Sequence, residues 1–118
     1  MDKKETKRYC QVLDLLPDEK SIEEYKRLHS KEYNWKVVRE GIKAVGILEM
    51  ELYLKGNLVI MVVETPLDFD WDTAMAKLAE MPMQKEWEDT VAAFQKCSRG
   101  LSSSEKWSMC ERIFYLYD

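Results

Sequence analysis

The heptapeptide EEYKRLH, residues Glu23 to His29, contains the only histidine of the chain. The reference pKa of histidine is about 6.5, so its imidazole can accept and donate protons near neutral pH. Tyr25 lies four residues earlier, and this spacing places the two side chains on the same side of a helix. A pair facing a cavity would suit general acid–base chemistry, whereas a pair in the core would be a hydrogen-bonded histidine packed beside an aromatic ring.

The sequence around this pair predicts the helix that would position it. Ser21 is the expected N-cap, and the helix should run to about Ser30. Ile22 falls on the same helical stripe as Tyr25 and His29. Because Ile22 should face a hydrophobic core, the tyrosine and the histidine should point inward with it.

Other side chains could bind a ligand beside this pair. Trp87, in QKEWED, should lie on a later helix, where its ring either packs in the core or offers a flat face to a sugar ring. The same alternatives apply to the other tryptophans, Trp35, Trp71 and Trp107. Three carboxylates could accept hydrogen bonds, although most carboxylates are simply solvated: Glu49, Glu51 and Glu88.

Composition and motifs exclude several classes of function. The net charge of −4 gives no electrostatic reason to bind nucleic acid or an anionic membrane. No phosphate loop, zinc-binding HExxH or GxSxG motif occurs, so we expect neither a metal nor a cofactor. The three cysteines are far apart in the sequence and have no metal-ligand spacing, so free thiols are expected at Cys10, Cys97 and Cys110. The N-terminal MDKKETKR is too polar for a secretory signal, which favours a cytoplasmic location.

We expect one domain over residues 1–118. Strands are predicted over 8–16, 47–54, 58–63 and 107–117, with a turn at Gly56-Asn57 and a loop over 98–104. Helices are predicted over 35–44 and over 71–94, the latter capped by Asp70 and interrupted at Pro82.

This order, β-α-β-β-α-β with the first helix in two pieces, predicts a ferredoxin-like α+β fold with helices on one face of an antiparallel sheet. The segment Leu58–Val63 is apolar throughout, so its strand would also present apolar side chains on the face without helices. A second copy packed sheet to sheet would cover that face. We therefore expect a homodimer of the dimeric α+β barrel type.

The sequence resembles the L-rhamnose mutarotase family over nearly its whole length. The matching segments are KRYCQVLDLLPD, EEYKRLH, ELYLKGNLVIMVVE, AMAKLAEMPMQKEWE and ERIFYLYD. The resemblance implies a cofactor-free enzyme that interconverts the α and β anomers of a 6-deoxy sugar such as L-rhamnose or L-fucose. In that family the histidine is the proton donor, and the tyrosine four residues before it contacts the sugar, which implies these roles for His29 and Tyr25.

The family pattern also has a Trp-Trp pair on the second helix and a tyrosine on the second strand. Here Trp87-Glu88 replaces the pair, Met50 replaces the tyrosine, and the stretch before Trp35 is about two residues longer. These departures concern substrate choice more than the reaction. The predicted site is thus His29 as the catalytic residue, with a substrate-binding set of Tyr25, Trp35, Glu49, Met50, Trp87 and Glu88.

Two alternatives remain at this point. The same fold hosts cofactor-free oxygenases and haem-degrading enzymes, and fold alone does not decide function. A sugar- or small-ligand-binding protein without catalysis is the second alternative.

Overall fold

The computed structural model of the chain describes residues 5–98 and 100–117. Its elements, in chain order, are β1 (Thr6–Asp14), α1 (Glu19–Leu28), α2 (Lys36–Ala44), β2 (Glu49–Lys55), β3 (Leu58–Pro66), α3 (Trp71–Ala79), α4 (Gln84–Ala92), α5 (Ser103–Lys106) and β4 (Ser108–Met109).

The four strands form one antiparallel sheet in the order β2-β3-β1-β4. The hairpin between β2 and β3 turns at Gly56-Asn57, as predicted, and Gly56 adopts the left-handed conformation with φ +61° that such a turn requires. Strand β1 pairs with β3 along its whole length, from Thr6 opposite Pro66 to Asp14 opposite Leu58. This order confirms the ferredoxin-like α+β prediction.

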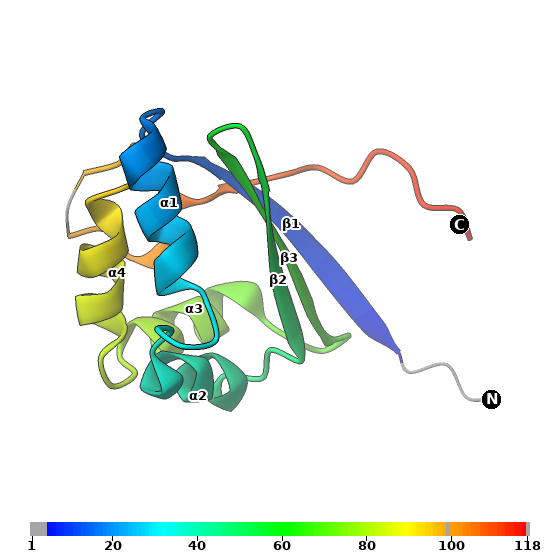
Figure 1. Cartoon of the computed structure of the whole chain (residues 1–118). Helices are drawn as coiled ribbons and strands as arrows, with labels where there is room; N and C mark the ends of the chain where they lie inside the picture. The colour runs from blue at the N-terminus through cyan, green and yellow to red at the C-terminus, as the bar shows by residue number, and fades with distance from the viewer. Residues whose placement is uncertain (1–4, 99, 118) are drawn as a thin grey trace.

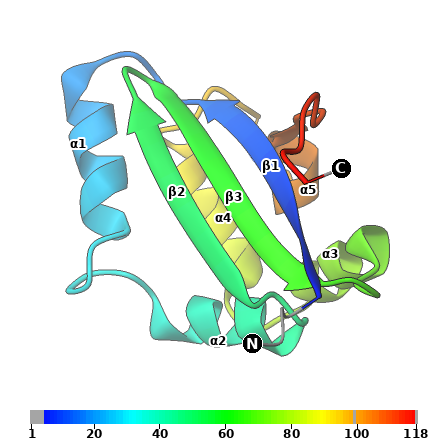
Figure 2. The same cartoon turned by 90° about the vertical axis from the view of Figure 1, so that its right-hand side faces the viewer.

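The long helices α1 to α4 lie on the same side of the sheet, and the opposite face of β2, β3 and β1 carries no helix in the described part of the chain (Figures 1 and 2). Along β3, Val59, Met61 and Val63 are buried under the helices. The alternate residues Leu58 and Ile60 point to the outer face and are only half-buried. The prediction of apolar side chains on both faces of this strand is therefore confirmed.

The caps explain where the helices begin. The N-cap of α1 is Asp18, whose carboxylate accepts a hydrogen bond from the Ser21 backbone N–H at 3.0 Å. The prediction of Ser21 as the cap was wrong, because the stronger acceptor three residues earlier starts the helix. Asp70 caps α3 as predicted. The chain breaks between α3 and α4, and Met83, the N-cap of α4, adopts the left-handed conformation there with φ 64°.

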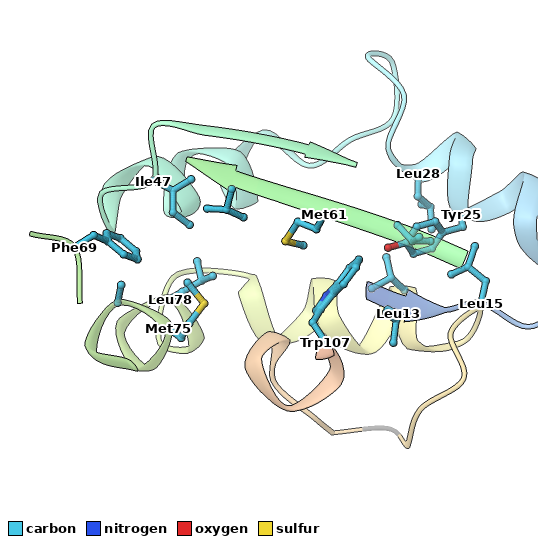
Figure 3. Close-up of a cluster of buried hydrophobic side chains, with 14 residues drawn as sticks. Leu13, Leu15, Tyr25, Leu28, Ile47, Met61, Phe69, Met75, Leu78 and Trp107 are labelled. Atoms are coloured by element: carbon cyan, nitrogen blue, oxygen red, sulfur yellow. The ribbon is translucent and has the colours of Figure 1, made fainter. Parts of the chain in front are cut away.

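The core fills the space between the helices and the sheet (Figure 3). Leu13 near the end of β1 and Leu15 just after it contribute to the core, together with Met61 from β3 and Trp107 from the segment after α5. Tyr25 from α1 belongs to the same cluster, so its burial against the sheet determines which face of α1 points inward.

The predicted closing strand over 107–117 was wrong for most of its length. Only Ser108–Met109 pair with β1, opposite Val12 and Gln11. Beyond them the chain extends away on the side of the sheet without helices (Figure 1), and Ile113 and Phe114 are 90% and 73% exposed. A strand-forming sequence needs a neighbouring strand to pair with, and none is provided here by the described residues of this chain.

The predicted loop over 98–104 is shorter than expected. Ser102 and Glu105 form a capping box that starts the short helix α5. Within the described residues, no helix combines the length and apolar character needed to cross a bilayer.

Candidate active site

A cavity of about 450 Å³ lies between the inner face of the sheet and helices α1, α2 and α4. This volume is in the range of small-molecule sites, about 300–1,000 Å³. His29 and Tyr25 from α1 and Trp87 from α4 form part of its wall. The predicted pair therefore faces a cavity large enough for a ligand.

The last turn of α1 orients His29. The His29 backbone N–H bonds to the Lys26 carbonyl, which leaves the Tyr25 carbonyl without its usual helical partner. The His29 side chain takes that position, with Nδ1 lying 2.7 Å from the Tyr25 carbonyl oxygen. Because a carbonyl oxygen can only accept, Nδ1 carries the hydrogen, and the lone pair of the neutral ring is on Nε2. Nε2 has no hydrogen-bond partner among the described residues, so it is available to a ligand.

Four aromatic rings form a continuous row along the cavity. The ring centroids of Tyr25 and His29 are 4.4 Å apart, and those of His29 and Trp87 are 5.2 Å apart in an edge-to-face arrangement. Trp35 continues the row, also edge to face with Trp87 at 5.2 Å. These contacts fix the imidazole between two rings and place a tryptophan beside it.

Burial lowers the pKa of His29 below its ordinary value, because it disfavours the charged imidazolium. The hydrogen bond to the Tyr25 carbonyl and the charge of Glu88 oppose this effect without cancelling it. The resting side chain at neutral pH is therefore mainly the neutral imidazole with Nε2 free to accept a proton.

Tyr25 is held as a neutral phenol. Burial raises its pKa far above the ordinary range, so the hydroxyl does not ionise at physiological pH. Gln95 donates a long hydrogen bond of 3.5 Å to the Tyr25 hydroxyl oxygen. The hydroxyl hydrogen consequently remains available to a bound ligand.

A buried polar cluster stands beside this aromatic row. The Lys106 ammonium donates to the Glu88 carboxylate at Oε1 over 2.9 Å and to the Glu88 backbone carbonyl over 2.6 Å. Gln84 Nε2 donates to Glu88 Oε2 over 2.6 Å. Glu88 is thus a carboxylate on the cavity wall that is fixed from two sides.

The structure brings His29 together with five of the six predicted substrate-binding residues. They all line the one cavity: Tyr25, Trp35, Met50, Trp87 and Glu88. Glu49 lies elsewhere, because neighbouring residues of a strand point to opposite faces and Met50 is the inward one. Glu49 and likewise Glu51 are exposed, away from the helices and the cavity.

Sequence reasoning missed Gln84, Gln95 and Lys106. Gln84 precedes Glu88 by four residues on α4, so helical spacing could have suggested it. The partners of the other two are distant in sequence, 18 residues for Lys106 and Glu88 and 70 for Gln95 and Tyr25. A local sequence pattern cannot predict contacts between residues this far apart in the chain.

None of the three cysteines is part of the cavity wall, although the Cys97 thiol donates to Oε1 of Gln95, which does line the cavity, at 3.7 Å. Cys10 and Cys110 are far apart in the sequence but adjacent in space, because the Cys110 backbone N–H donates to the Cys10 carbonyl at 2.8 Å. Burial and a hydrogen bond with Cys110 raise the pKa of the Cys10 thiol. All three cysteines are free, and the described residues contain no group of three or more His, Cys, Asp or Glu side chains suited to a metal ion.

The fold and the cavity together define a small α+β protein with a histidine in the wall of a ligand-sized cavity. A family model described as L-rhamnose mutarotase matches residues 8–116. The chain belongs to this family, which makes it a carbohydrate-acting isomerase of the mutarotase class.

Two relatives are similar to this chain over most of its length. The chain is 34% identical to an L-fucose mutarotase of Xanthomonas campestris over 92% of its own length and 87% of that protein. It is 33% identical to a UPF0734 protein of Dictyostelium discoideum, covering 98% of this chain and 94% of the relative.

The fold is similar to that of an L-rhamnose mutarotase from Formosa agariphila, with a TM-score of 0.69 and 18% identity, covering 93% of this chain and 98% of the other. It is also similar to that of tetracenomycin F2 cyclase from Streptomyces glaucescens, a type-II polyketide cyclase, with a TM-score of 0.58 and 14% identity, covering 95% and 97%. At these identities the likeness concerns the fold alone, and the second neighbour illustrates that one fold carries different chemistries.

Proposed function

We propose that the protein interconverts the α and β anomers of a 6-deoxy sugar without a cofactor, with His29 as the general acid at the ring oxygen. The observation that carries this proposal is the fixed orientation of His29, with Nδ1 held by the Tyr25 carbonyl and Nε2 free in a cavity of about 450 Å³.

Anomer exchange requires the C1–O5 bond to break and to form again on the other face of the C1 carbonyl. During opening, O1 loses a proton, the C1=O1 double bond forms, and O5 gains a proton as the C1–O5 bond breaks. Neutral His29 can accept the O1 proton at Nε2, and the resulting imidazolium can donate it to O5. Both oxygens are bonded to C1, so one nitrogen can serve both. Rotation of the open-chain aldehyde followed by the reverse transfers gives the other anomer.

This route fits the neutral resting state of His29, because a neutral imidazole begins the cycle by accepting a proton and acts as the acid only afterwards. General acid–base catalysis supplies roughly 10²–10⁴-fold. Such an acceleration is sufficient for a reaction that already proceeds slowly in water. Tyr25 would donate a hydrogen bond to the sugar, and the Trp87 ring beside His29 would pack against its C–H groups.

For the substrate we propose L-fucose in preference to L-rhamnose. An L-fucose mutarotase is among the relatives that share a third of their residues with this chain. Glu88 stands where the resemblance has the second tryptophan of its pair, and a fixed carboxylate accepts hydroxyl hydrogens that an indole ring cannot.

We also propose that the protein forms a homodimer through the outer face of the sheet. Half-buried apolar side chains on that face include Val12, Ile60 and Val62, and the described helices leave them uncovered. The exposed apolar residues of the 110–117 segment extend on the same side (Figure 1). A second copy packed sheet to sheet would bury both features.

The experiment that tests the enzymatic proposal is exchange NMR between the α and β signals of L-fucose, L-rhamnose and other 6-deoxy sugars. We expect catalysed exchange that increases with protein concentration and is strongest for L-fucose. Binding of these sugars without any acceleration of exchange would instead support the non-catalytic alternative.

A further inference from the structure

Lys106 is the most deeply buried charged group near the site, with a side chain that is 0% exposed. Within the described residues, the Lys106 ammonium donates two hydrogen bonds, and both go to Glu88, one to the carboxylate and one to the backbone carbonyl. Removing an ammonium group from water is costly, and apolar residues of similar size are often at least as stabilising as a buried ion pair. Packing alone therefore does not account for a lysine at this position.

Gln84 completes the arrangement on the other side of Glu88. Only the amide nitrogen can donate to the Glu88 carboxylate, so the 2.6 Å contact fixes which way the Gln84 amide is turned. Gln84 Oε1 is then left buried without a hydrogen-bond partner in the described structure. The Gln84 amide thus keeps its hydrogen bond to Glu88 although its own oxygen has no partner. Because buried polar atoms are usually paired, this arrangement indicates that Gln84 serves to orient the Glu88 carboxylate.

Each Glu88 oxygen receives one protein donor, Lys106 on Oε1 and Gln84 on Oε2, and a carboxylate oxygen can accept more than one hydrogen bond. Glu88 is also the sole carboxylate among the described residues that line the cavity. The remaining acceptor capacity of this carboxylate is therefore the one strong, negatively charged acceptor that the cavity wall offers to sugar hydroxyl groups.

We propose that Lys106 is a positioning residue for substrate choice. It acts through Glu88, holding that carboxylate in one orientation so that it accepts a hydrogen bond from a specific ring hydroxyl and selects among 6-deoxy sugars. Gln84 holds the same carboxylate from the opposite side. This inference rests on the proposed sugar-binding function of the cavity and adds the residue that sets its preference.

The test replaces the ion pair as a unit, because Lys106→Met alone would leave Glu88 buried without its counter-charge and could unfold the protein. The double variant Glu88→Gln/Lys106→Met removes both charges at nearly constant volume. The matched control is Lys85→Met/Asp89→Asn, which removes a solvent-accessible ion pair of 3.3 Å from the same helix. The melting temperature of each variant is measured first, so that exchange rates refer to folded protein.

The measurement is kcat/KM for L-fucose, L-rhamnose and analogues of L-fucose that each lack one ring hydroxyl. In the wild type we expect kcat/KM for one analogue to be about 10- to 100-fold lower than for L-fucose, which is the size expected for one lost hydrogen bond to a charged group. In the double variant this penalty should disappear, and the fucose-to-rhamnose ratio should fall about 10-fold or more, mainly through KM, because His29 is unchanged. The control should keep the wild-type ratio.

A folded double variant with the wild-type sugar ratio and the wild-type penalty for every analogue would overturn the inference and leave Lys106 a purely structural residue. That result is distinct from failure of the proposed function, in which the wild type itself would not accelerate exchange of any sugar. In that case the same sugars and analogues are compared by NMR titration, and equal relative affinities in the wild type and the double variant would again overturn the role of Lys106.

Discussion

Replacing His29 by asparagine is the sharpest perturbation that the site allows. The asparagine amide nitrogen can take the place of Nδ1 and keep a donor to the Tyr25 carbonyl, which lies 2.7 Å from Nδ1 in the wild type. The variant has no equivalent of Nε2, so it cannot relay a proton. His29→Ala is the companion variant, because it removes the donor and the ring together.

The expected magnitudes differ for activity and stability. Both variants should lose the acid–base contribution to exchange, roughly 10²–10⁴-fold. His29→Ala also loses one hydrogen bond, about 0.5–1.5 kcal/mol, together with packing against Tyr25 and Trp87. We expect a total loss of about 1–3 kcal/mol in unfolding free energy for alanine and clearly less for asparagine.

The pH dependence of stability and of exchange distinguishes the structural role of His29 from its catalytic role. The pKa of folded His29 lies below its value of about 6.5 in the unfolded chain, so between these values the unfolded state binds more protons. The contribution of His29 to unfolding free energy is therefore complete above about pH 6.5 and decreases as the pH falls toward the folded pKa. Catalysed exchange should also be constant above that range and fall at lower pH, because the neutral ring starts the cycle.

The assays are exchange NMR normalised to folded protein and urea denaturation at several pH values. If the His29→Asn variant exchanged the anomers at the wild-type rate, the assignment of the proton relay to Nε2 would be refuted. A rate that rises as the pH is lowered through 6.5 would show that the resting imidazolium is the active form and would refute the order of proton transfers.

Three further outcomes are expected. Light scattering should give a dimer at micromolar concentration and a monomer for Val62→Glu, which places a charge on the outer sheet face; a monomeric wild type would contradict the proposed assembly. Tyr25→Phe should weaken sugar binding by about 0.5–1.5 kcal/mol, measured as KM in the exchange assay, with little change in kcat. L-fucose should exchange faster than L-rhamnose, and a large preference for L-rhamnose over L-fucose and every other 6-deoxy sugar would contradict the reasoning from Glu88.

Much of the fold could be predicted from the sequence because its signals are local. The Gly56-Asn57 turn, the Asp70 cap and the continuously apolar segment of strand β3 are each recognised from a few neighbouring residues. The closing strand could not be predicted, because the strand-forming residues after Met109 lack a neighbouring strand in the described part of the chain. Strand propensity describes a preference for a pleated partner surface, and it does not supply that partner.

The site divides in the same way. The Tyr25 and His29 pair was predictable, because helical spacing and one inward-facing isoleucine determine its direction. The exposed position of Glu49 was not predicted. Glu49 and Met50 point to opposite faces of β2, and the position of the helices shows that Met50 is on the inward face. Lys106 was also missed, because a lysine in a polar stretch gives no indication that its ammonium group is buried against another helix.

The local contact of His29 with Tyr25 and the long-range contact of Glu88 with Lys106 have different consequences for how the activity can change. The imidazole of His29, to which we assign the proton transfer, is oriented within the last turn of α1 by a carbonyl four residues away, so we expect this contact to be insensitive to changes elsewhere in the chain. The part of the cavity wall that we propose for sugar recognition is instead assembled from α4 and α5 through the contact of Glu88 with Lys106. We therefore expect that substitutions on this wall change which sugar is accepted and leave the proposed proton transfer by His29 in place. Such a separation would allow a chain to keep the Tyr25 and His29 pair and to carry Glu88 where the family resemblance implies a second tryptophan.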